Sequence, residues 1–565
     1  MMKTTHCILP GRLNRFFGGR AATLLLAAAL VSATALLPGC GSSISNNNNA
    51  GIPLEILWTN DTHGYFLPVY HAEFEEISTY AQTAATEGKV GGYAQIVSLV
   101  KYQKAQPGNT NVLFLDGGDT FDGSPVAQLT RGAAVVPVLN AMGFDAMVPG
   151  NRDFAFSKAD FLSVTSKLTF PIVAANLQDA TTGVHVFPRY VIKQTPQLKI
   201  ALIGLTSPLA GGTTGFKVQG GSPTTPGGFQ IEDEISALAA QIRATDNPDL
   251  VVAISHFGYV QDQKFASRST GIDVIVGAHT HHNIYDAPVV ANKDGSRQVV
   301  VVQAGSHGKF LGKLDLVVKE KKVASYKNEL IRVVASELTK RNITPDATVL
   351  GLAQAAYAPF QAMLDEVIGA STSVLERRGD VQSTMSNFLA DATSSIFGVD
   401  VSNHFGIRYG STIIPGPVTV GDVWNMVSPN IGNNGMYVLT QTGTQIKATL
   451  NSGLNVEYGA DIYNWGGGDV SRFNTRVKYT YKVNAADNQH IVDLKVITAA
   501  GETVQLTKNG VDDAVAMARV FTFAATSGAA TAQVPNTTAV DEIVKYIKTK
   551  GTISSKIDDR AVRVD

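Results

Sequence analysis

The chain contains only two cysteines among its 565 residues, Cys7 and Cys40, and both precede residue 41. If the N-terminal segment is removed as described below, no intramolecular disulfide can form in the remaining chain. Cysteine nucleophiles and thiolate metal ligands are excluded for the same reason. Any metal site must therefore be built from imidazole nitrogen and from oxygen ligands.

The chain also lacks an excess of charge of either sign. Its 46 Lys and Arg residues nearly cancel its 47 Asp and Glu residues, so no bulk charge attracts a nucleic-acid polymer, although a local basic pocket is compatible with this balance. A hydrophobic content of 44% is typical of a globular protein, and the length predicts two domains. We expect a small-molecule ligand and no obligate protein partner.

Long apolar runs are absent except near the N-terminus, where residues 21–37 follow a basic segment. The next residues, Leu37-Pro38-Gly39-Cys40, resemble the lipobox of bacterial lipoproteins; an ordinary signal peptide or a membrane anchor is the alternative. We predict a signal peptide over residues 1–40, lipidation at Cys40 and a flexible tether over residues 41–52. The protein would then be extracytoplasmic and lipid-anchored to the bacterial cell envelope.

The rest of the chain divides into three predicted parts. Over residues 53–335 strands alternate with helical patterns, which is typical of a layered α/β domain. Residues 336–368 form a connector, in which Asp346–Ile368 is apolar at helical spacing. Residues 369–565 are richer in β-structure and form a smaller, mixed α+β domain.

Within this last part, residues 476–483 and 491–498 alternate like paired strands, and Asn509-Gly510 predicts a turn.

Five short motifs rich in histidine and carboxylate each follow a strand-like run. The runs are Leu54–Trp58, Val112–Leu115, Ala146–Val148, Leu250–Ile254 and Val274–Val276; the motifs are Asp61-Thr62-His63, Gly118-Asp119, Gly150-Asn151-Arg152-Asp153, Ser255-His256 and Gly277-Ala278-His279-Thr280-His281. Loops at the carboxyl ends of strands gather at one rim of an α/β sheet. Any one motif alone could be an ordinary turn, but together they predict a metal-dependent hydrolase.

Two metal ions about 3.5 to 4 Å apart need a carboxylate that both can share. Asp119, in a glycine-rich loop, is the candidate bridge. Asp61 and His63 can face one ion, and neutral ligands are available in Asn151, His256, His279 and His281. Four other histidines lack this position after a strand and are interpreted as structural or surface residues: His71, His185, His282 and His307.

In this order the motifs resemble those of the calcineurin-like metallophosphoesterases, and more narrowly the two-domain bacterial 5'-nucleotidase family in its lipoprotein form. The resemblance implies a four-layer αββα domain followed by a smaller α+β domain. It also implies two divalent ions, zinc, manganese or similar, and attack of a metal-bound hydroxide on phosphorus. One ion would be held by Asp61, His63, Asp119 and His281, and the other by Asp119, Asn151, His256 and His279.

The C-terminal part resembles the same family more loosely, in Ser386–Ala392, Asn403–Arg408 and Gly416–Asp422. Carried over, this domain would supply the pocket for a small phosphate ester, a nucleotide. Its candidate substrate-binding residues are Arg408, Asn403, Asn433 and Arg378.

The chain departs from the family at two places. The family's catalytic His-Asp dyad is replaced by Arg152 and Ala155, and an arginine does not release a proton at ordinary pH. Because general-acid help is typically worth about 10² to 10⁴-fold, substrates with alkoxide leaving groups should turn over slowly, with activated esters less affected. The alternative is that Arg152 is merely a surface replacement in a weakened enzyme. The two rings that sandwich the base in the family are also missing here, from residues 430–433 and 527–530. Tyr463 and Trp465 are candidate substitutes, or alternatively part of a packed loop.

Three hypotheses follow. The first is a lipid-anchored phosphoesterase for nucleotides or related esters. The second is a divergent specificity for a non-nucleotide or sulfur substrate, since the thiosulfohydrolase branch of the family also lacks the dyad histidine. The third is a surface lipoprotein that binds nucleotide with little turnover.

Overall fold

The computed structural model describes residues 51–72, 79–208, 215–220, 231–379, 381–404, 410–427, 435–459, 470–525 and 537–565. The predictions on Cys40, Arg408, Asn433 and the ring residues lie outside these ranges. Within them, no helix combines the length and apolar character needed to cross a bilayer.

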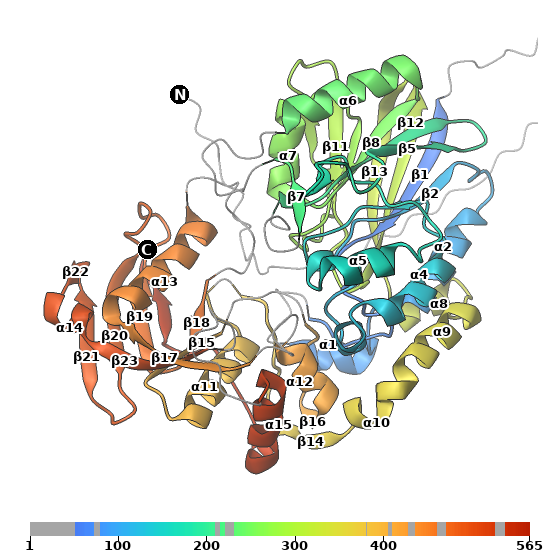
Figure 1. Cartoon of the computed structure of the whole chain (residues 1–565). Coiled ribbons are helices and arrows are strands. Elements are labelled where there is room, and N and C mark those ends of the chain that lie inside the picture. The colour runs from blue at the N-terminus through green and yellow to red at the C-terminus, as the bar shows by residue number, and fades with distance from the viewer. Residues whose placement is uncertain are drawn as a thin grey trace, which may run out of the picture. The chain divides into compact units, whose positions relative to one another are not determined.

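Two sheets form the first part of the described chain (Figure 1). The five-stranded sheet has the order β13-β12-β1-β2-β3, with β1, β2 and β3 parallel, and the six-stranded sheet has the order β10-β11-β9-β8-β6-β5. The strands of the first sheet are β1 (Ile52–Thr59), β2 (Val112–Asp116), β3 (Ala146–Met147), β12 (Phe310–Lys319) and β13 (Lys322–Arg332). Those of the second are β5 (Tyr190–Gln194), β6 (Lys199–Leu205), β8 (Leu250–Ser255), β9 (Val274–Val276), β10 (Val289–Ala291) and β11 (Gln298–Val302).

The two sheets pack face to face. One buried cluster joins Ile56 and Leu115 of the first sheet to Val252 and Val276 of the second. The outer faces are covered by helices, α2 (Tyr93–Lys104) and α4 (Val136–Met142) on one side and α6 (Glu232–Thr245) and α7 (Tyr259–Arg268) on the other. The predicted αββα order is therefore confirmed.

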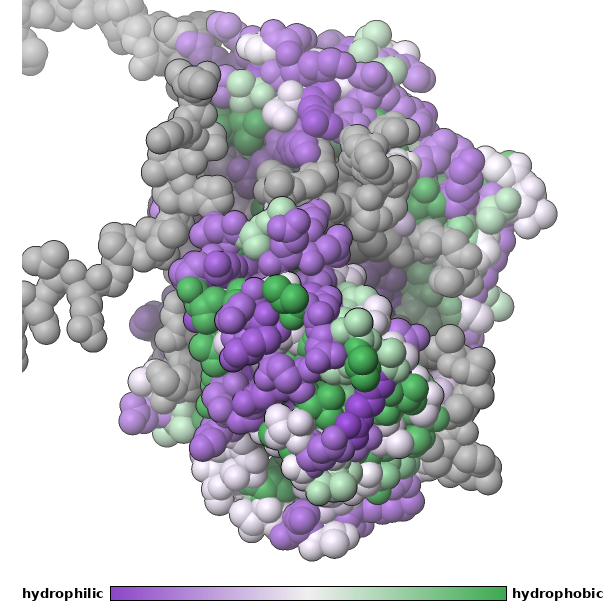
Figure 2. Space-filling view, turned by 90° about the vertical axis from the view of Figure 1, so that its left-hand side faces the viewer, coloured by the Kyte–Doolittle hydropathy of each residue, from purple (hydrophilic) through white to green (hydrophobic). Residues whose placement is uncertain are grey.

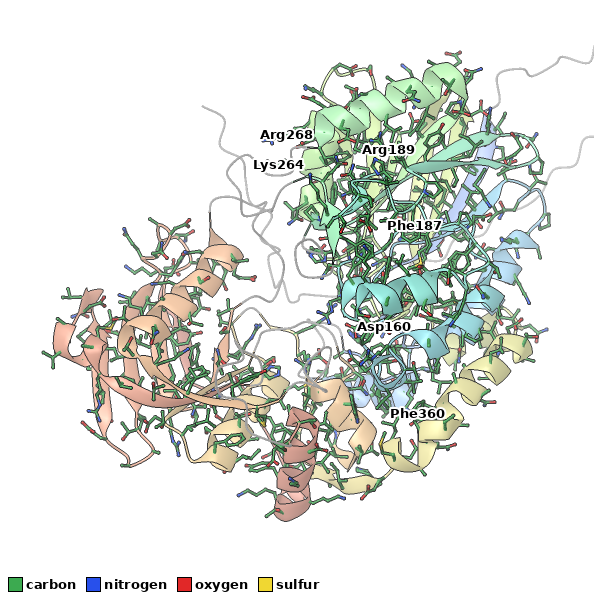
Figure 3. The ribbon with its side chains drawn as sticks, viewed as in Figure 1. Asp160, Phe187, Arg189, Lys264, Arg268 and Phe360 are labelled. Atoms are coloured by element: carbon green, nitrogen blue, oxygen red, sulfur yellow. The ribbon has the colours of Figure 1, made fainter. Side chains whose placement is uncertain are left out.

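Shorter elements complete this part of the chain. They are α1 (Tyr80–Glu87), α3 (Pro125–Leu129), η2 (Ala133–Val135), η3 (Arg152–Phe154), α5 (Lys158–Thr165) and the pair β4 (Leu177–Asp179) and β7 (Phe216–Val218). Helix α5 begins with a capping box between Ser157 and Asp160, and Asp160 is labelled in Figure 3.

The connector helix begins where the sequence predicts but ends early. The side chain of Asp346 accepts a hydrogen bond from the Val349 N–H at 3.0 Å and caps α9 (Ala347–Tyr357). The helix is then broken by η5 (Ala358–Phe360), which contains Pro359, before α10 (Gln361–Leu364). The expected helix through Ile368 is wrong in its last turn, because proline interrupts the hydrogen bonding and β14 begins at Val367. A further helix, α8 (Ala335–Lys340), precedes α9.

The C-terminal part contains three sheets among its described residues, with the orders β16-β14-β24, β17-β23-β15-β18 and β22-β21-β20-β19-β25. The predicted strand pair is confirmed as antiparallel β19 and β20, and Asn509-Gly510 forms the turn between β21 and β22 with φ angles of 50° and 80°.

The strands of this part are β14 (Val367–Ser371), β15 (Val401–His404), β16 (Gly416–Thr419), β17 (Tyr437–Thr442), β18 (Arg472–Phe473), β19 (Val477–Tyr481), β20 (Ile491–Ile497), β21 (Thr503–Lys508), β22 (Val511–Asp512), β23 (Val520–Ala525), β24 (Thr552–Ile553) and β25 (Ala561–Arg563). The helices are α11 (Thr384–Phe397), α12 (Val420–Val427), α13 (Gly443–Tyr458), α14 (Ala514–Ala518) and α15 (Ala539–Lys550).

The surface that includes β22 and α14 mixes polar with apolar side chains (Figure 2). Val511, Val515 and Val520 are exposed there. Scattered apolar side chains of this kind are common on folded domains. The histidine and carboxylate motifs lie elsewhere, in the interior.

Candidate metal centre

The histidines and carboxylates predicted from the sequence converge into two buried clusters. Asp61, His63 and His281 form one cluster and Asp119, His256 and His279 the other, and in each cluster the ligand atoms lie within 4.8 Å of one another. They follow strands β1, β2, β8 and β9, which belong to two sheets. The expectation that one sheet edge gathers them is therefore corrected: the carboxyl ends of two facing sheets do so.

Most of these residues adopt an unusual backbone conformation. The φ angles are 51° at Asp61, 49° at His63, 57° at Asp119, 73° at His279 and 58° at His281. Left-handed conformations of non-glycine residues cost about 1 to 3 kcal/mol each and cluster at functional sites, where the surrounding structure enforces them. These strained conformations lower the stability of the fold and direct the side chains inward.

Two glycines allow the ligand loops to approach one another. A Cβ at Gly118, whose φ is 87°, would lie 2.4 Å from the carbonyl oxygen of Val148. A Cβ at Gly150 would lie 2.1 Å from Oδ1 of Asp119. Larger residues at these positions would push the Asp119 loop away from the Asn151 loop.

Hydrogen bonds fix the tautomers of two histidines. Nδ1 of His63 lies 2.9 Å from the carbonyl oxygen of Asp122, and Nδ1 of His256 lies 2.7 Å from that of Gly117. Because a carbonyl only accepts, each Nδ1 carries a hydrogen, and Nε2 is the ring nitrogen that is left to bind a cation. Nε2 of His63 lies 3.1 Å from Nε2 of His281, an arrangement of two nitrogens that a shared cation explains.

The charges of the site favour a cation. Burial lowers the pKa of His256, but the carboxylates of Asp119 and Asp61 outweigh this effect and raise it to about 10. Nε2 of His256 lies 3.3 Å from Oδ2 of Asp119 and 3.8 Å from Oδ1 of Asp61. Burial lowers the pKa of His63 to about 4, so that imidazole stays neutral. A divalent cation would replace the proton on His256 and neutralise both carboxylates.

Asn151 gives a further test of whether the residues fit a metal. Its Oδ1 is buried and accepts no hydrogen bond from the residues that the structure describes. A buried oxygen without a donor is costly, and a metal ion would satisfy it. The donor set of imidazole nitrogens, carboxylates and one amide oxygen therefore fits a pair of divalent transition metals.

Asp153 belongs to one of the five predicted motifs but was assigned no role from the sequence, yet it organises the ligand loops. Its carboxylate accepts four backbone N–H groups, from Asp119 at 2.9 Å, Thr120 at 2.7 Å, Phe121 at 2.8 Å and Gly150 at 2.8 Å. Burial and the nearby Asp119 raise its pKa to about 6, although these donors lower it. Asp153 ties the loop after β2 to the loop after β3.

Arg152 has a partner that the sequence did not indicate. Its backbone N–H donates to Oδ1 of Asp119 at 2.6 Å. Its side chain donates to Oδ2 of Asp122, from Nε at 3.0 Å and from Nη2 at 2.5 Å. Arg152 is thus paired with an acid from the loop after β2.

His307 contributes to the centre although its side chain is not among the predicted ligands. Its backbone N–H donates to the carbonyl oxygen of Asp61 at 2.8 Å, and its Nε2 accepts the Gly410 N–H at 3.2 Å. Its ring packs against those of His71 and Tyr65, with centroid distances of 4.3 and 4.7 Å. The expectation that His307 does not follow a strand is corrected, because it lies five residues after the end of β11 (Gln298–Val302), a signal that could have identified it.

Of the predicted substrate-binding residues, Arg378 lies beside the metal ligands. Its Nη2 donates to the carbonyl oxygen of His281 at 3.4 Å. Asn403 lies in β15, opposite Phe473, and is half-buried. Arg408 and Asn433 belong to residues that the structure leaves undescribed.

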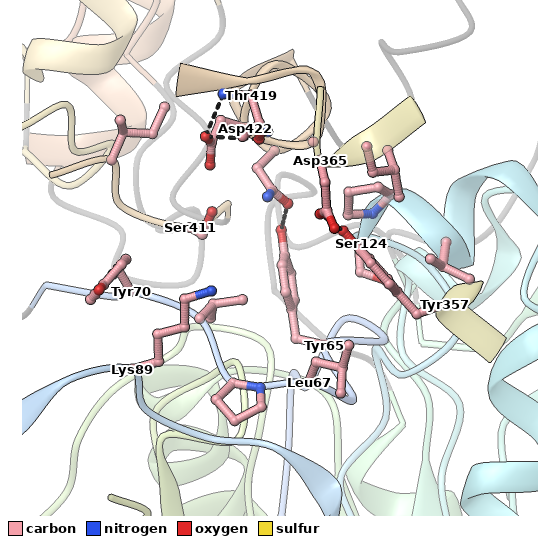
Figure 4. A pocket seen from close by; sticks show the side chains of 18 of the residues that line it. Tyr65, Leu67, Tyr70, Lys89, Ser124, Tyr357, Asp365, Ser411, Thr419 and Asp422 are labelled. Atoms are coloured by element: carbon pink, nitrogen blue, oxygen red, sulfur yellow. Dashed lines mark hydrogen bonds between the residues drawn. The ribbon is translucent and has the colours of Figure 1, made fainter. Parts of the chain in front are cut away.

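A cavity of about 400 Å³ lies next to the centre without including any predicted ligand (Figure 4). It is lined by Gly64–Tyr70, the segment that follows His63, and by parts of the connector and C-terminal part, among them Asp365 and Asp422. The Tyr65 hydroxyl donates to Oδ1 of Asn425 at 2.7 Å across this region. Contacts of this kind link the ligand loops to the C-terminal part.

Comparisons with known proteins agree with this arrangement. Residues 54–283 match the calcineurin-like phosphoesterase model and residues 367–535 the 5'-nucleotidase C-terminal domain model. The trifunctional nucleotide phosphoesterase protein YfkN of Bacillus subtilis is 27% identical over 454 residues, which cover 70% of this chain but only 28% of that protein. The 5'-nucleotidase of Vibrio parahaemolyticus is 27% identical over 474 residues, covering 76% of this chain and 79% of its own length.

Among solved structures, the sulfate thiohydrolase SoxB of Thermus thermophilus superposes with a TM-score of 0.77. It is 23% identical, and the match covers 94% of this chain and 98% of that one. At this identity the likeness concerns the fold.

Fold, clustered ligands and matched domains define the chain as a metallophosphoesterase, a hydrolase with a site for two metal ions. More particularly, an αββα phosphoesterase domain followed by a 5'-nucleotidase C-terminal domain is the organisation of the two-domain 5'-nucleotidase family, and the chain belongs to that family.

Proposed function

We propose that the chain hydrolyses nucleotides or related small phosphate esters outside the cytoplasm. The observation that carries this proposal is the pair of buried clusters, in each of which the ligand atoms lie within 4.8 Å of one another. The nucleotide part of the proposal is supported by the match to the 5'-nucleotidase C-terminal domain and by the Vibrio 5'-nucleotidase.

The proposed ligand sets follow the two clusters. Asp61, His63 and His281 would hold one ion and His256, His279 and Asn151 the other, with Asp119 available to both. Zinc, manganese or a similar ion suits these donors. When bound, the ions activate water for attack on phosphorus and stabilise the charge that develops on the phosphoryl oxygens.

Arg152 supplies a positive charge near the phosphoryl group in place of the dyad histidine. A guanidinium binds phosphate oxygens well but does not hand a proton to the leaving oxygen. The leaving oxygen therefore keeps the electrons of the broken P–O bond and takes its proton from water. Substrates with weakly basic leaving groups, such as phosphoanhydrides and aryl phosphates, should react faster than simple alkyl esters.

The C-terminal domain is proposed to hold the rest of the substrate through Arg378, Asn403, Arg408 and Asn433. The contact of Arg378 with the backbone of His281 supports its assignment, because it places a cationic side chain beside the ligand loop. Lipidation at Cys40 would keep the enzyme at the cell envelope, where extracellular nucleotides are available.

A second candidate function is hydrolysis of a sulfur substrate that releases sulfate. It is favoured by one observation on this chain, the non-titrating Arg152 with its acidic partner where a His-Asp dyad is usual. Thiolates leave without protonation, so such a site would suit them.

A release panel separates the two candidates. Purified chain loaded with manganese or zinc is assayed for phosphate release from a nucleoside monophosphate, a nucleotide sugar and p-nitrophenyl phosphate, and for sulfate release from a small S-sulfonate (R–S–SO₃⁻), whose S–S bond to the sulfo group is hydrolysed to a thiol and sulfate. The proposal predicts phosphate release that Asp119→Ala abolishes. Sulfate release alone would overturn it, and nucleotide binding without any release would establish the low-turnover binding protein.

A further inference from the structure

Asp122 is a buried acid near the centre that belongs to neither ligand cluster. Its side chain is fully buried, whereas that of Arg152 is 15% exposed. Its Oδ2 accepts both Nε and Nη2 of Arg152, and its Oδ1 accepts the side-chain amide of Gln128 in α3. Both carboxylate oxygens are therefore satisfied, and the guanidinium is held through two of its nitrogens.

The backbone of Asp122 contacts the metal cluster directly. Its carbonyl oxygen accepts the Nδ1–H of His63 at 2.9 Å, and Nε2 of His63 points toward Nε2 of His281, 3.1 Å away. Arg152 contacts the second cluster, because its backbone N–H donates to Oδ1 of Asp119 at 2.6 Å. The Asp122 and Arg152 pair thus joins the loops that carry His63, Asp119 and Asn151.

The ion pair with Asp122 holds the guanidinium of Arg152 in one conformation. Holding a guanidinium in one rotamer removes most of the entropy that Arg152 would lose on meeting a phosphate. The fixed charge can then act where negative charge develops, which is the most effective arrangement for electrostatic stabilisation. A freely rotating arginine at this position would bind phosphate but would not hold it in line for attack.

We propose that Asp122 is a positioning residue for hydrolysis, which fixes the guanidinium of Arg152 beside the reacting phosphoryl group and orients His63 through its carbonyl oxygen. This inference rests on the proposed function of the same site. In this proposal the Asp122 and Arg152 pair, whose members come from two different loops, takes the place of the family's dyad, whose members lie close together in the sequence.

A double-mutant cycle tests the role of the carboxylate. Asp122→Asn keeps the carbonyl that orients His63 but removes the negative charge that holds Arg152. Asp122→Asn, Arg152→Gln and the double variant are compared with the full-length chain for metal content and for kcat/KM with p-nitrophenyl phosphate. Arg131→Gln is the matched control, because Arg131 forms an exposed ion pair with Asp160 in the same domain.

Each single variant is expected to lose about 10- to 100-fold in kcat/KM while retaining two metal ions, since misplacing an oriented group costs rates of that order. Adding Asp122→Asn to Arg152→Gln should change kcat/KM by no more than about twofold. Asp122→Glu should recover part of the activity, and Arg131→Gln should retain all of it.

Losses that multiply in the double variant would overturn the inference, as would metal loss from Asp122→Asn that excess metal repairs. Should the wild-type chain release no phosphate at all, the proposed function fails by itself. The cycle is then measured as calorimetric affinity for inorganic phosphate on the metal-loaded chain, with the same non-additivity expected if Asp122 acts through Arg152.

Discussion

Asp153→Asn should destabilise the metallophosphoesterase domain far more than its nearly equal size suggests. The two carboxylate oxygens each accept two backbone N–H groups, with Oδ1 bonded to Thr120 and Phe121 and Oδ2 to Asp119 and Gly150. An asparagine keeps one oxygen, so its amide NH₂ must face one pair of donors. Each buried N–H left without an acceptor costs about 1 to 3 kcal/mol, which gives about 2 to 6 kcal/mol for the pair.

Calorimetry is the appropriate assay for this variant. A loss of about 4 kcal/mol corresponds to about 8 to 16 °C in the melting temperature of a domain of this size, read on the transition that added metal shifts upward. Metal affinity should also weaken by about 10- to 100-fold, because the loops of Asp119 and Gly150 lose their tie.

The control is Asp160→Asn, where an exposed carboxylate accepts from Ser157 and Arg131 and the expected cost is about 1 kcal/mol or less. A shift of the Asp153→Asn transition no larger than that of the control would refute the reasoning.

Three further predictions concern leaving groups, metals and the contact between the two parts of the chain. Across aryl and alkyl phosphates, kcat/KM should fall steeply as the pKa of the leaving group rises, and a flat dependence would contradict the role given to Arg152. Removing metal with a chelator should lower the melting temperature. Each ion restored at about 100 times its Kd should raise the free energy of unfolding by about 2.7 kcal/mol. An unchanged melting temperature would argue against a metal site in the folded state. Tyr65→Phe should cost about 1 kcal/mol, measured by denaturant unfolding, because the buried amide oxygen of Asn425 loses its donor; Tyr357→Phe, at an exposed hydrogen bond to Asp365, should cost less.

The candidate ligands could be found from the sequence because each follows a strand closely. The strand fixes where the next few residues emerge, so Asp61, Asp119, His256 and His279 could be located without knowing how the sheets pack. Their convergence depends on two sheets facing each other, however, and the sequence does not state which strands share a sheet. For that reason we expected the ligand loops to meet at the edge of one sheet, whereas they meet at the carboxyl ends of two facing sheets.

Partners that join different loops could not be predicted. Asp122 and Arg152 lie 30 positions apart. The family resemblance drew attention to Arg152, but nothing in the sequence indicated Asp122 as its partner. Asp153 could not be predicted either, because its role depends on the backbone N–H groups that another loop donates to its carboxylate. The end of the connector helix was missed for a local reason. The apolar spacing continues to Ile368, whereas the α-helix is interrupted at Ala358–Phe360, which contains Pro359, and ends at Leu364.

The most direct test of the central claim is anomalous X-ray diffraction from crystals of the chain grown with manganese or zinc. The account predicts two peaks about 3.5 to 4 Å apart, one within ligand distance of Asp61, His63 and His281 and the other of Asn151, His256 and His279, with Asp119 between them. A single peak, or metal bound away from these side chains, would contradict it.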